Sequence, residues 1–241
     1  MARINRRNSC PKVEYVNFQQ QDKTCSPKFV KNVKGRTANQ ELLLEAIDTS
    51  PLTLAIGPAG TGKTYLAVVK AVEALSSRRV SKIIISRPVV AAEEELGFLP
   101  GDLNQKMDPW MRPIFDALNE RMGAKQVRDA IRNGEIEIAP LAYMRGRTFS
   151  NVFGIFDEMQ NATLGQLKMV LTRLGWQSTI VITGDPDQSD LLPGVSGLTE
   201  IAERLADLDG VSIVRLEDGD IVRHPLVGAM LPRLAKIGAA Q

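Results

Sequence analysis

The chain is poor in cysteine, histidine and aromatic residues. It holds two cysteines, Cys10 and Cys25, and one histidine, His224. Without metal-ligand spacing or nearby partners, these residues predict neither a metal site nor a nucleophile–histidine pair, and we expect reduced thiols rather than a disulfide. Aromatic residues make up 5% of the chain, so a base-stacking surface for nucleic acid has thin support.

Long apolar runs are also missing. No run approaches the length that spans a membrane, and the N-terminus lacks the apolar core of a signal peptide. We therefore expect a soluble, cytoplasmic protein that has no membrane partner. A length of 241 residues suits one α/β domain with an appendage.

The net charge of +2 is unevenly distributed. Residues 1–36 hold nine Lys or Arg against Glu14 and Asp22, a balance of +7, so the remaining residues carry −5. We expect residues 1–35 to form a basic, flexible tail and residues 36–241 to form the folded domain. Such a tail can bind nucleic acid by releasing counterions. A solubilising arm or an oligomer clasp would explain it equally well.

From Thr37 onward, apolar strands alternate with amphipathic helices, which predicts an α/β domain with a parallel sheet covered by helices on both faces. The expected strands are Leu52–Ile56, Lys82–Ser86, Ile136–Ala139, Val152–Phe156, Thr179–Thr183 and Val211–Leu216. The expected helices are Asn39–Asp48, Lys63–Leu75, Pro109–Arg121, Lys125–Arg132, Leu164–Leu174, Leu198–Ala206 and Leu226–Ile237. Between them, Pro88–Pro109 is predicted to be a long functional loop.

Residues 57–64 form a complete phosphate-binding loop between an expected strand and an expected helix. Its glycines let successive backbone N–H groups converge on a phosphate. The Lys63 ammonium can reach the β- and γ-phosphates, and the Thr64 hydroxyl can ligate Mg²⁺. We therefore predict ATP contacts from the whole loop and the first helical residue: Gly57, Pro58, Ala59, Gly60, Thr61, Gly62, Lys63, Thr64 and Tyr65.

Two further strands end in polar residues, which a parallel sheet brings to the same edge as the phosphate loop. Asp157 is predicted to lie at the Mg²⁺, and Glu158 to polarise the attacking water as general base. Gln188 is predicted to touch the γ-phosphate or that water. Asp185 and Asp187 are either part of this sensor or ordinary turn residues.

Phosphoryl transfer commonly uses an arginine that neutralises charge on the γ-phosphate. Arg147 and Arg223 are the candidates, acting within one chain or from a neighbouring subunit. A surface or helix-capping role suits His224 better than catalysis.

These motifs resemble the PhoH family of ATPases, relatives of the first core domain of superfamily-1 helicases. The matching segments are Gly57–Thr64, Ser86–Pro88, Glu94–Leu103, Tyr143–Thr148, Asp157–Gln160, Thr183–Gln188 and Val222–Leu226. The resemblance implies a RecA-like P-loop NTPase fold, with ATP and Mg²⁺ as cofactors. It also implies an adenine contact from Gln40 and an ATP contact from Arg36, which begins the same segment. Arg87 would have a nucleic-acid or inter-subunit role, and Arg223 a finger role. Met159 replaces the alanine that is more usual in this family.

We expect an ATP hydrolase without the nuclease domain of some relatives and without a second helicase lobe. A ring of subunits, expected to be a hexamer, would replace that lobe, and the enzyme would act on RNA or single-stranded DNA. The alternative is an ATP-dependent switch or assembly module for a protein partner. A kinase is disfavoured, because Glu158 suits hydrolysis and no acceptor pocket is evident.

Overall fold

The computed structural model describes residues 33–88, 103–191 and 196–222, together with Leu226 and Met230; over 103–110 it describes the backbone alone. The expected tail lies outside this range up to residue 32, as does most of the expected helix Leu226–Ile237. Val33, the first described residue, already packs against the core.

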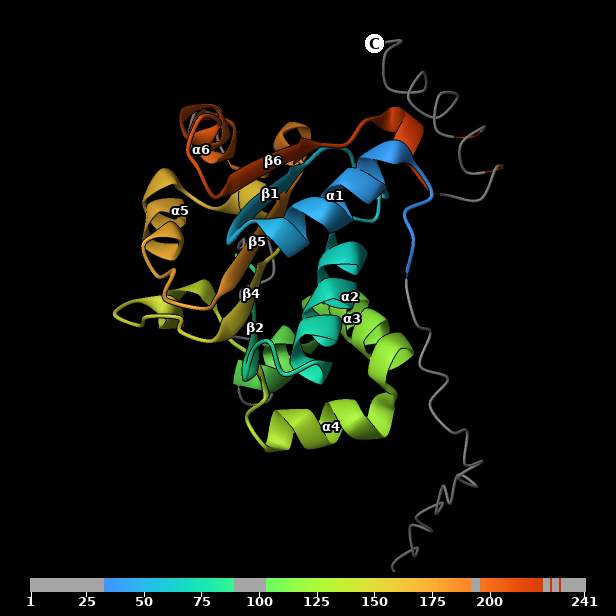
Figure 1. Cartoon of the computed structure of the whole chain (residues 1–241), viewed down its shortest axis with the longest axis vertical. Helices are drawn as coiled ribbons and strands as arrows, with labels where there is room; N and C mark the ends of the chain where they lie inside the picture. Colours follow the sequence, from blue (N-terminus) through green and yellow to red (C-terminus); the bar gives the residue numbers. More distant parts are fainter. Residues whose placement is uncertain (1–32, 89–102, 192–195, 223–225, 227–229, 231–241) are drawn as a thin grey trace, which may run out of the picture.

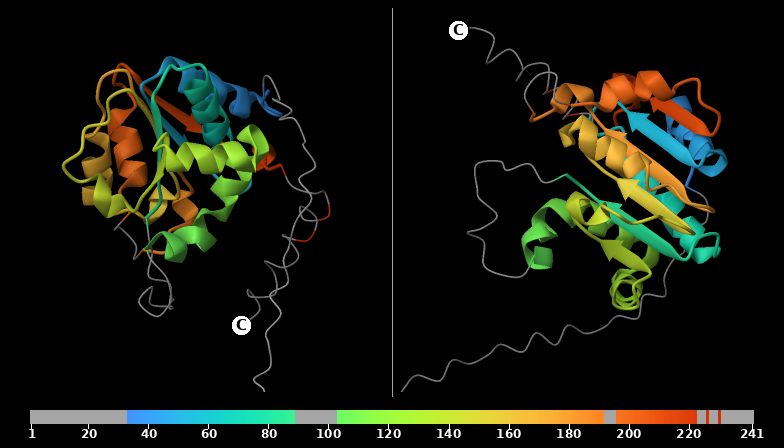
Figure 2. Two further views of the ribbon diagram at one scale, coloured as in Figure 1. Left: turned by 90° about the horizontal axis from the view of Figure 1, so that it is seen from below. Right: turned by 90° about the vertical axis from the view of Figure 1, so that its left-hand side faces the viewer.

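Six parallel strands form one sheet in the order β3-β2-β4-β5-β1-β6. Their bounds are β1 Leu52–Ile56, β2 Lys82–Ser86, β3 Ile136–Ile138, β4 Val152–Phe156, β5 Thr179–Gly184 and β6 Val211–Arg215. Every residue of β1 and β4 is buried, as expected of central parallel strands. Figure 2 shows the strands as arrows that share one direction. The predicted α/β parallel sheet is confirmed.

Helices cover both faces of this sheet (Figure 1). One core cluster packs against α1 Ala38–Thr49, α2 Lys63–Ser76, α3 Leu103–Met122 and α4 Ala124–Arg132. The other packs against α5 Leu164–Leu171, α6 Leu198–Leu205 and the 3-10 helix η2 Leu141–Met144. Three more 3-10 turns follow strand ends: η3 Met159–Asn161, η4 Pro186–Gln188 and η5 Asp218–Asp220.

The start of α3 differs from the sequence-based prediction. The pattern predicts Pro109 as the first helical residue, since proline is favoured there, but the helix begins at Leu103 and includes Pro109 and Pro113. Buried Met111, Ile114 and Leu118 pack this helix onto the core, and tertiary packing outweighs the backbone bonds that proline removes. Although α3 has 20 residues, no described helix is long and apolar enough to cross a membrane.

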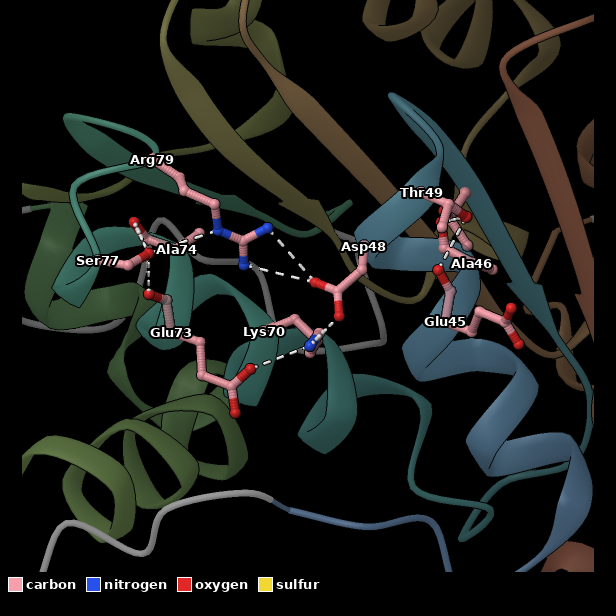
Figure 3. Close-up of polar contacts among 10 residues, drawn as sticks. Glu45, Ala46, Asp48, Thr49, Lys70, Glu73, Ala74, Ser77 and Arg79 are labelled. Atoms are coloured by element: carbon pink, nitrogen blue, oxygen red, sulfur yellow. Dashed lines mark hydrogen bonds and ion pairs between the residues drawn. The ribbon is translucent and has the colours of Figure 1, made fainter.

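An ion-pair network ties the end of α1 to α2 (Figure 3). Asp48 pairs with Lys70 and, at 3.4 Å, with Arg79, while Lys70 Nζ also lies 3.0 Å from Glu73. Lys70 is only 12% exposed, so this pair is held by packing as well as by charge. The network fixes α1 beside the helix that follows the phosphate loop.

The turn after β1 requires glycine at residue 57. Its φ is +148°, and a Cβ there would lie 2.2 Å from the carbonyl oxygen of Leu216. Gly134, after α4, also has positive φ (+74°), but a Cβ there would meet nothing within 4 Å. A substitution at Gly134 therefore introduces backbone strain alone, whereas one at Gly57 introduces backbone strain and a steric clash.

We expect Gly134→Ala to lower the free energy of unfolding by about 1 kcal/mol, the cost of a positive φ for an L-residue. Gly57→Ala should cost roughly 3 kcal/mol, because the Leu216 carbonyl must also move. Urea denaturation of both variants measures the difference. Equal losses would show that the contact with Leu216 does not constrain this turn.

Candidate nucleotide site

The carboxyl ends of the central strands meet at one edge of the sheet, where the phosphate loop joins β1 to α2. A cavity of about 450 Å³ opens there. It is lined by Ala59, Gly60, Gly62, Lys63, Thr64, Tyr65, Pro113, Asp116, Ala117, Glu120, Asp157, Glu158, Thr183, Gly184, Asp185 and Gln188. The sheet thus brings together segments that are far apart in sequence.

The phosphate loop is preformed. Gly62, the N-cap of α2, has a left-handed backbone, and no described side chain caps the N-terminus of this helix, which leaves its N–H groups suited to an anion. The Thr61 hydroxyl donates to the Pro58 carbonyl at 2.8 Å, and the Ala59 N–H donates to Asp185 at 3.1 Å. Gly57, Pro58 and buried Thr61 build the base of the loop, whereas Ala59, Gly60 and Gly62 line the cavity.

Lys63 is folded back on its own loop. Its ammonium donates to the carbonyls of Gly57 at 2.5 Å and Pro58 at 2.7 Å. Burial lowers the pKa of Lys63, and the carboxylates of Asp185, Glu158 and Asp157 oppose that shift. A triphosphate in the cavity would offer the ammonium a stronger partner than two carbonyls.

Asp157 connects the ends of two strands with the start of α2. Its carboxylate is buried and accepts the hydroxyls of Thr64 at 2.6 Å and Thr183 at 2.5 Å. The Thr64 hydroxyl and the Asp157 carboxylate, the two predicted metal ligands, are thus adjacent. They fit Mg²⁺, which takes few protein ligands and completes its shell with water and phosphate oxygens.

Glu158 lines the cavity, and neighbouring residues hold its carboxylate in place. Its backbone is left-handed (φ +54°, ψ +39°), which is uncommon for a residue other than glycine. One carboxylate oxygen lies 3.1 Å from the Arg87 guanidinium, and the other accepts the Gln160 amide at 2.5 Å. The predicted general base is therefore at the site, with both oxygens engaged.

The segment after β5 connects to both Glu158 and the phosphate loop. The side-chain amide oxygen of Gln160 accepts the Asp185 N–H at 3.1 Å, while the Asp185 carboxylate accepts the N–H groups of Ala59 and Asp187 at 3.1 and 3.2 Å. Asp185 is thus both a turn residue and a partner of the phosphate loop. Gln188 lines the cavity as an exposed side chain, as a γ-phosphate contact requires.

The sequence reading missed the wall that α3 contributes. Pro113, Asp116, Ala117 and Glu120 line the cavity, and the Tyr65 hydroxyl donates to Glu120 at 2.9 Å. Burial is the main cause of a raised pKa of Tyr65, and the hydrogen bond to Glu120 raises this pKa further. Asp116 and Glu120 lie four residues apart on one helix face, a spacing visible only once the helix register is known.

Gln40 lies beneath the phosphate loop. Its buried amide donates to the carbonyls of Thr61 at 2.9 Å and Asp220 at 3.3 Å, and it accepts the Arg36 N–H at 2.8 Å. Gln40 and exposed Arg36 do not line the cavity. The structure therefore makes Gln40 a support of the loop, and its adenine contact stays a prediction.

The two predicted finger arginines differ in what the structure says of them. Arg147 lies away from the cavity: it makes two bonds to Glu137, at 2.6 and 2.9 Å, and its guanidinium lies 5.7 Å from the centre of the Phe149 ring. The hydrogen bond from Arg147 lowers the pKa of Glu137. Burial opposes this shift, and the hydrogen bond from Lys82 lowers the pKa further. Arg223 lies outside the described residues, but Val222, just before it, donates to the Gly60 carbonyl at 3.0 Å.

The chain is similar to proteins of one known family. The family model described as PhoH-like protein matches residues 32–234. The PhoH-like protein of Bacillus subtilis (strain 168) is 48% identical over 220 residues, covering 91% of this chain and 69% of that protein. Protein PhoH of Escherichia coli (strain K12) is 44% identical over 217 residues, covering 89% of this chain and 60% of that protein.

Among solved structures, the large terminase of a thermophilic bacteriophage aligns with a TM-score of 0.53. The alignment covers 82% of this chain and 50% of the terminase at 11% identity, so this likeness shows the fold alone. The family model and the relatives show that the chain belongs to the PhoH-like family, and its parallel sheet and phosphate loop have the P-loop ATPase fold.

Proposed function

We propose that this protein hydrolyses ATP with Mg²⁺, using Glu158 as general base. The observation that carries the proposal is the contact between Thr64 and Asp157 in a cavity that Lys63 and Glu158 also line. Bound Mg²⁺ would neutralise phosphate charge beside Thr64 and Asp157. Glu158 would accept a proton as water bonds to the γ-phosphorus and the bond to the β-phosphate oxygen breaks, which releases ADP and phosphate.

The charge of the cavity supports an additional cation. Its described lining carries five carboxylates, on Asp116, Glu120, Asp157, Glu158 and Asp185, and a single cation, Lys63. A nucleoside triphosphate would add further negative charge. An arginine from outside this lining would stabilise the transferring phosphate. We propose Arg223 for this role, supplied across the interface of a homo-oligomeric ring, with ATP held between subunits.

We further propose that the ring acts on RNA or single-stranded DNA. The support is the charge of residues 1–36, which carry +7 while the rest of the chain carries −5. A basic segment of this kind attracts polyanions, because their condensed counterions are released when its Lys and Arg side chains bind the phosphates.

Substitutions in the cavity test hydrolysis. Lys63→Ala should abolish nucleotide binding or turnover. Glu158→Gln should keep binding and lose about a hundredfold or more in kcat, the usual effect of removing a positioned base. Phosphate release and titration with a fluorescent ATP analogue measure the two effects. Glu137→Gln, the same change at a carboxylate outside the cavity, should keep kcat; near-normal kcat in Glu158→Gln would remove Glu158 from the role of base.

Mixed rings test where the arginine comes from. Arg223→Ala should lose about a thousandfold in kcat while still binding nucleotide and assembling. Mixing it with inactive Lys63→Ala should restore part of the turnover, because an intact Lys63 then meets an intact Arg223 across some interfaces. Arg147→Ala should keep kcat within about threefold, since Arg147 is bound to Glu137. Full activity in a preparation that ultracentrifugation shows to be monomeric contradicts the shared site.

Deleting residues 1–35 tests the basic segment. The truncated protein should bind single-stranded nucleic acid more weakly and with a flatter dependence of log K on log salt, because fewer counterions are released. Replacing the Lys and Arg of the segment by Gln is the matched control that keeps its length. An unchanged slope in both variants leaves the segment as a clasp or a solubilising arm, and favours a protein partner for the ATPase.

A further inference from the structure

The carboxylate of Glu158 is held from two sides by residues that do not line the cavity. Arg87, directly after β2, lies 3.1 Å from one oxygen, and Gln160 in η3 donates to the other at 2.5 Å. A water that is to lose its proton to Glu158 must compete with both partners for the same oxygens. These contacts therefore describe a resting arrangement of the proposed base.

The backbone around this pair is in an uncommon conformation. Glu158 has positive φ although it carries a side chain, and its carbonyl accepts the Asn161 N–H at 3.0 Å. Such residues persist where surrounding contacts enforce them, and they concentrate at switch regions. Beside it, the Ser86 hydroxyl is fully buried and has no hydrogen-bond partner among the described residues, although buried hydroxyls normally have one. The positive φ of Glu158, after β4, and the unpaired Ser86 hydroxyl, at the end of β2, both fit a site whose side chains have a second set of contacts.

The contacts of Glu158 also reach the phosphate loop. Gln160 joins the Glu158 carboxylate to the Asp185 N–H, and Asp185 in turn holds the Ala59 N–H of the loop. Arg87 is bonded to this chain of contacts at its outer end, and its side chain is 26% exposed. An event at Arg87 can therefore change the orientation of the base without entering the nucleotide cavity.

We propose that Arg87 is a positioning residue that holds Glu158 at rest, and that a nucleic-acid phosphate releases Glu158 by taking over the Arg87 guanidinium. The chemistry is an exchange of partners, since a phosphate offers a guanidinium the same two-oxygen geometry as a carboxylate. Freed from Arg87, Glu158 can orient the attacking water. This inference rests on the proposed function, because it explains how the polymer would accelerate ATP turnover.

Thermodynamic linkage makes the exchange reciprocal. Arg87 cannot hold a phosphate and Glu158 at the same time with the same donors. Removing the Glu158 charge should therefore strengthen nucleic-acid binding, and it should do so only when Arg87 is present. This second consequence involves binding alone and does not depend on hydrolysis.

The first experiment measures ATP turnover of the full chain with and without a short oligouridylate. The wild type should be stimulated. Arg87→Gln should show kcat raised about threefold to fivefold without oligonucleotide, the factor that a partly exposed ion pair contributes, an unchanged KM, and no further stimulation. Arg87→Lys should restore part of both properties. Lys82→Gln, which removes a cation from an ion pair at the other end of β2, should behave as the wild type.

The second experiment measures oligouridylate affinity by anisotropy in a double-mutant cycle. Glu158→Gln should bind about threefold more tightly than the wild type, and the same change in an Arg87→Gln background should have no effect. Equal tightening in both backgrounds would mean that Glu158 acts only through general charge, and would overturn the proposal.

The outcomes separate this inference from the function on which it rests. If the wild type does not hydrolyse ATP, or Glu158→Gln turns over normally, the proposed function fails. If hydrolysis behaves as expected but Arg87→Gln lowers kcat, Arg87 assists the base and the resting clamp is wrong. If Arg87→Gln raises kcat while oligouridylate neither binds nor stimulates the wild type, the releasing partner is not a nucleic acid, and the proposal fails in that part.

Discussion

The site depends on one buried carboxylate. Asp157 accepts hydroxyl groups from Thr64, in the first turn of α2, and from Thr183, near the end of β5, while its own N–H donates to the Ser86 carbonyl at the end of β2. Together with β4, which ends just before Asp157, four elements therefore meet at a single residue. A buried carboxylate is costly unless its partners are fixed, so the arrangement that satisfies Asp157 also fixes the relative positions of the phosphate loop and the strand ends.

The sequence reading was most accurate where the pattern is local. Continuous apolar runs placed β1, β2 and β4 with their bounds as observed, and the spacing of Gly57, Gly62 and Lys63 placed the loop. It was least accurate where distant segments decide the outcome. The start of α3 depends on packing that outweighs two prolines, and the pair between Arg87 and Glu158 joins the ends of two strands. Neither interaction leaves a signal in the neighbouring residues.

Gln40 shows how a correct location can differ from an expected role. Its position in the chain suggests a base contact by resemblance, yet its amide is occupied by the carbonyls of Thr61 and Asp220 and by the Arg36 N–H. Asp220 is buried as well. Burial opposes a lower pKa for its carboxyl group, but hydrogen bonds from Thr37, Glu217 and Asn39 outweigh it and lower the pKa. These contacts join α1, the phosphate loop and η5.

The same loop thus has two polar supports on opposite sides. Beneath it, Gln40 bonds to Thr61, and on the side of the cavity Asp185 bonds to Ala59. The first support leads toward Arg223 and the second, through Gln160 and Glu158, toward Arg87. Because hydrogen bonds in a connected network reinforce one another, a small movement of the phosphate loop would also change the contacts of the Glu158 carboxylate. If Glu158 is the base that we propose, the geometry of its carboxylate therefore depends on the phosphate loop as well as on Arg87.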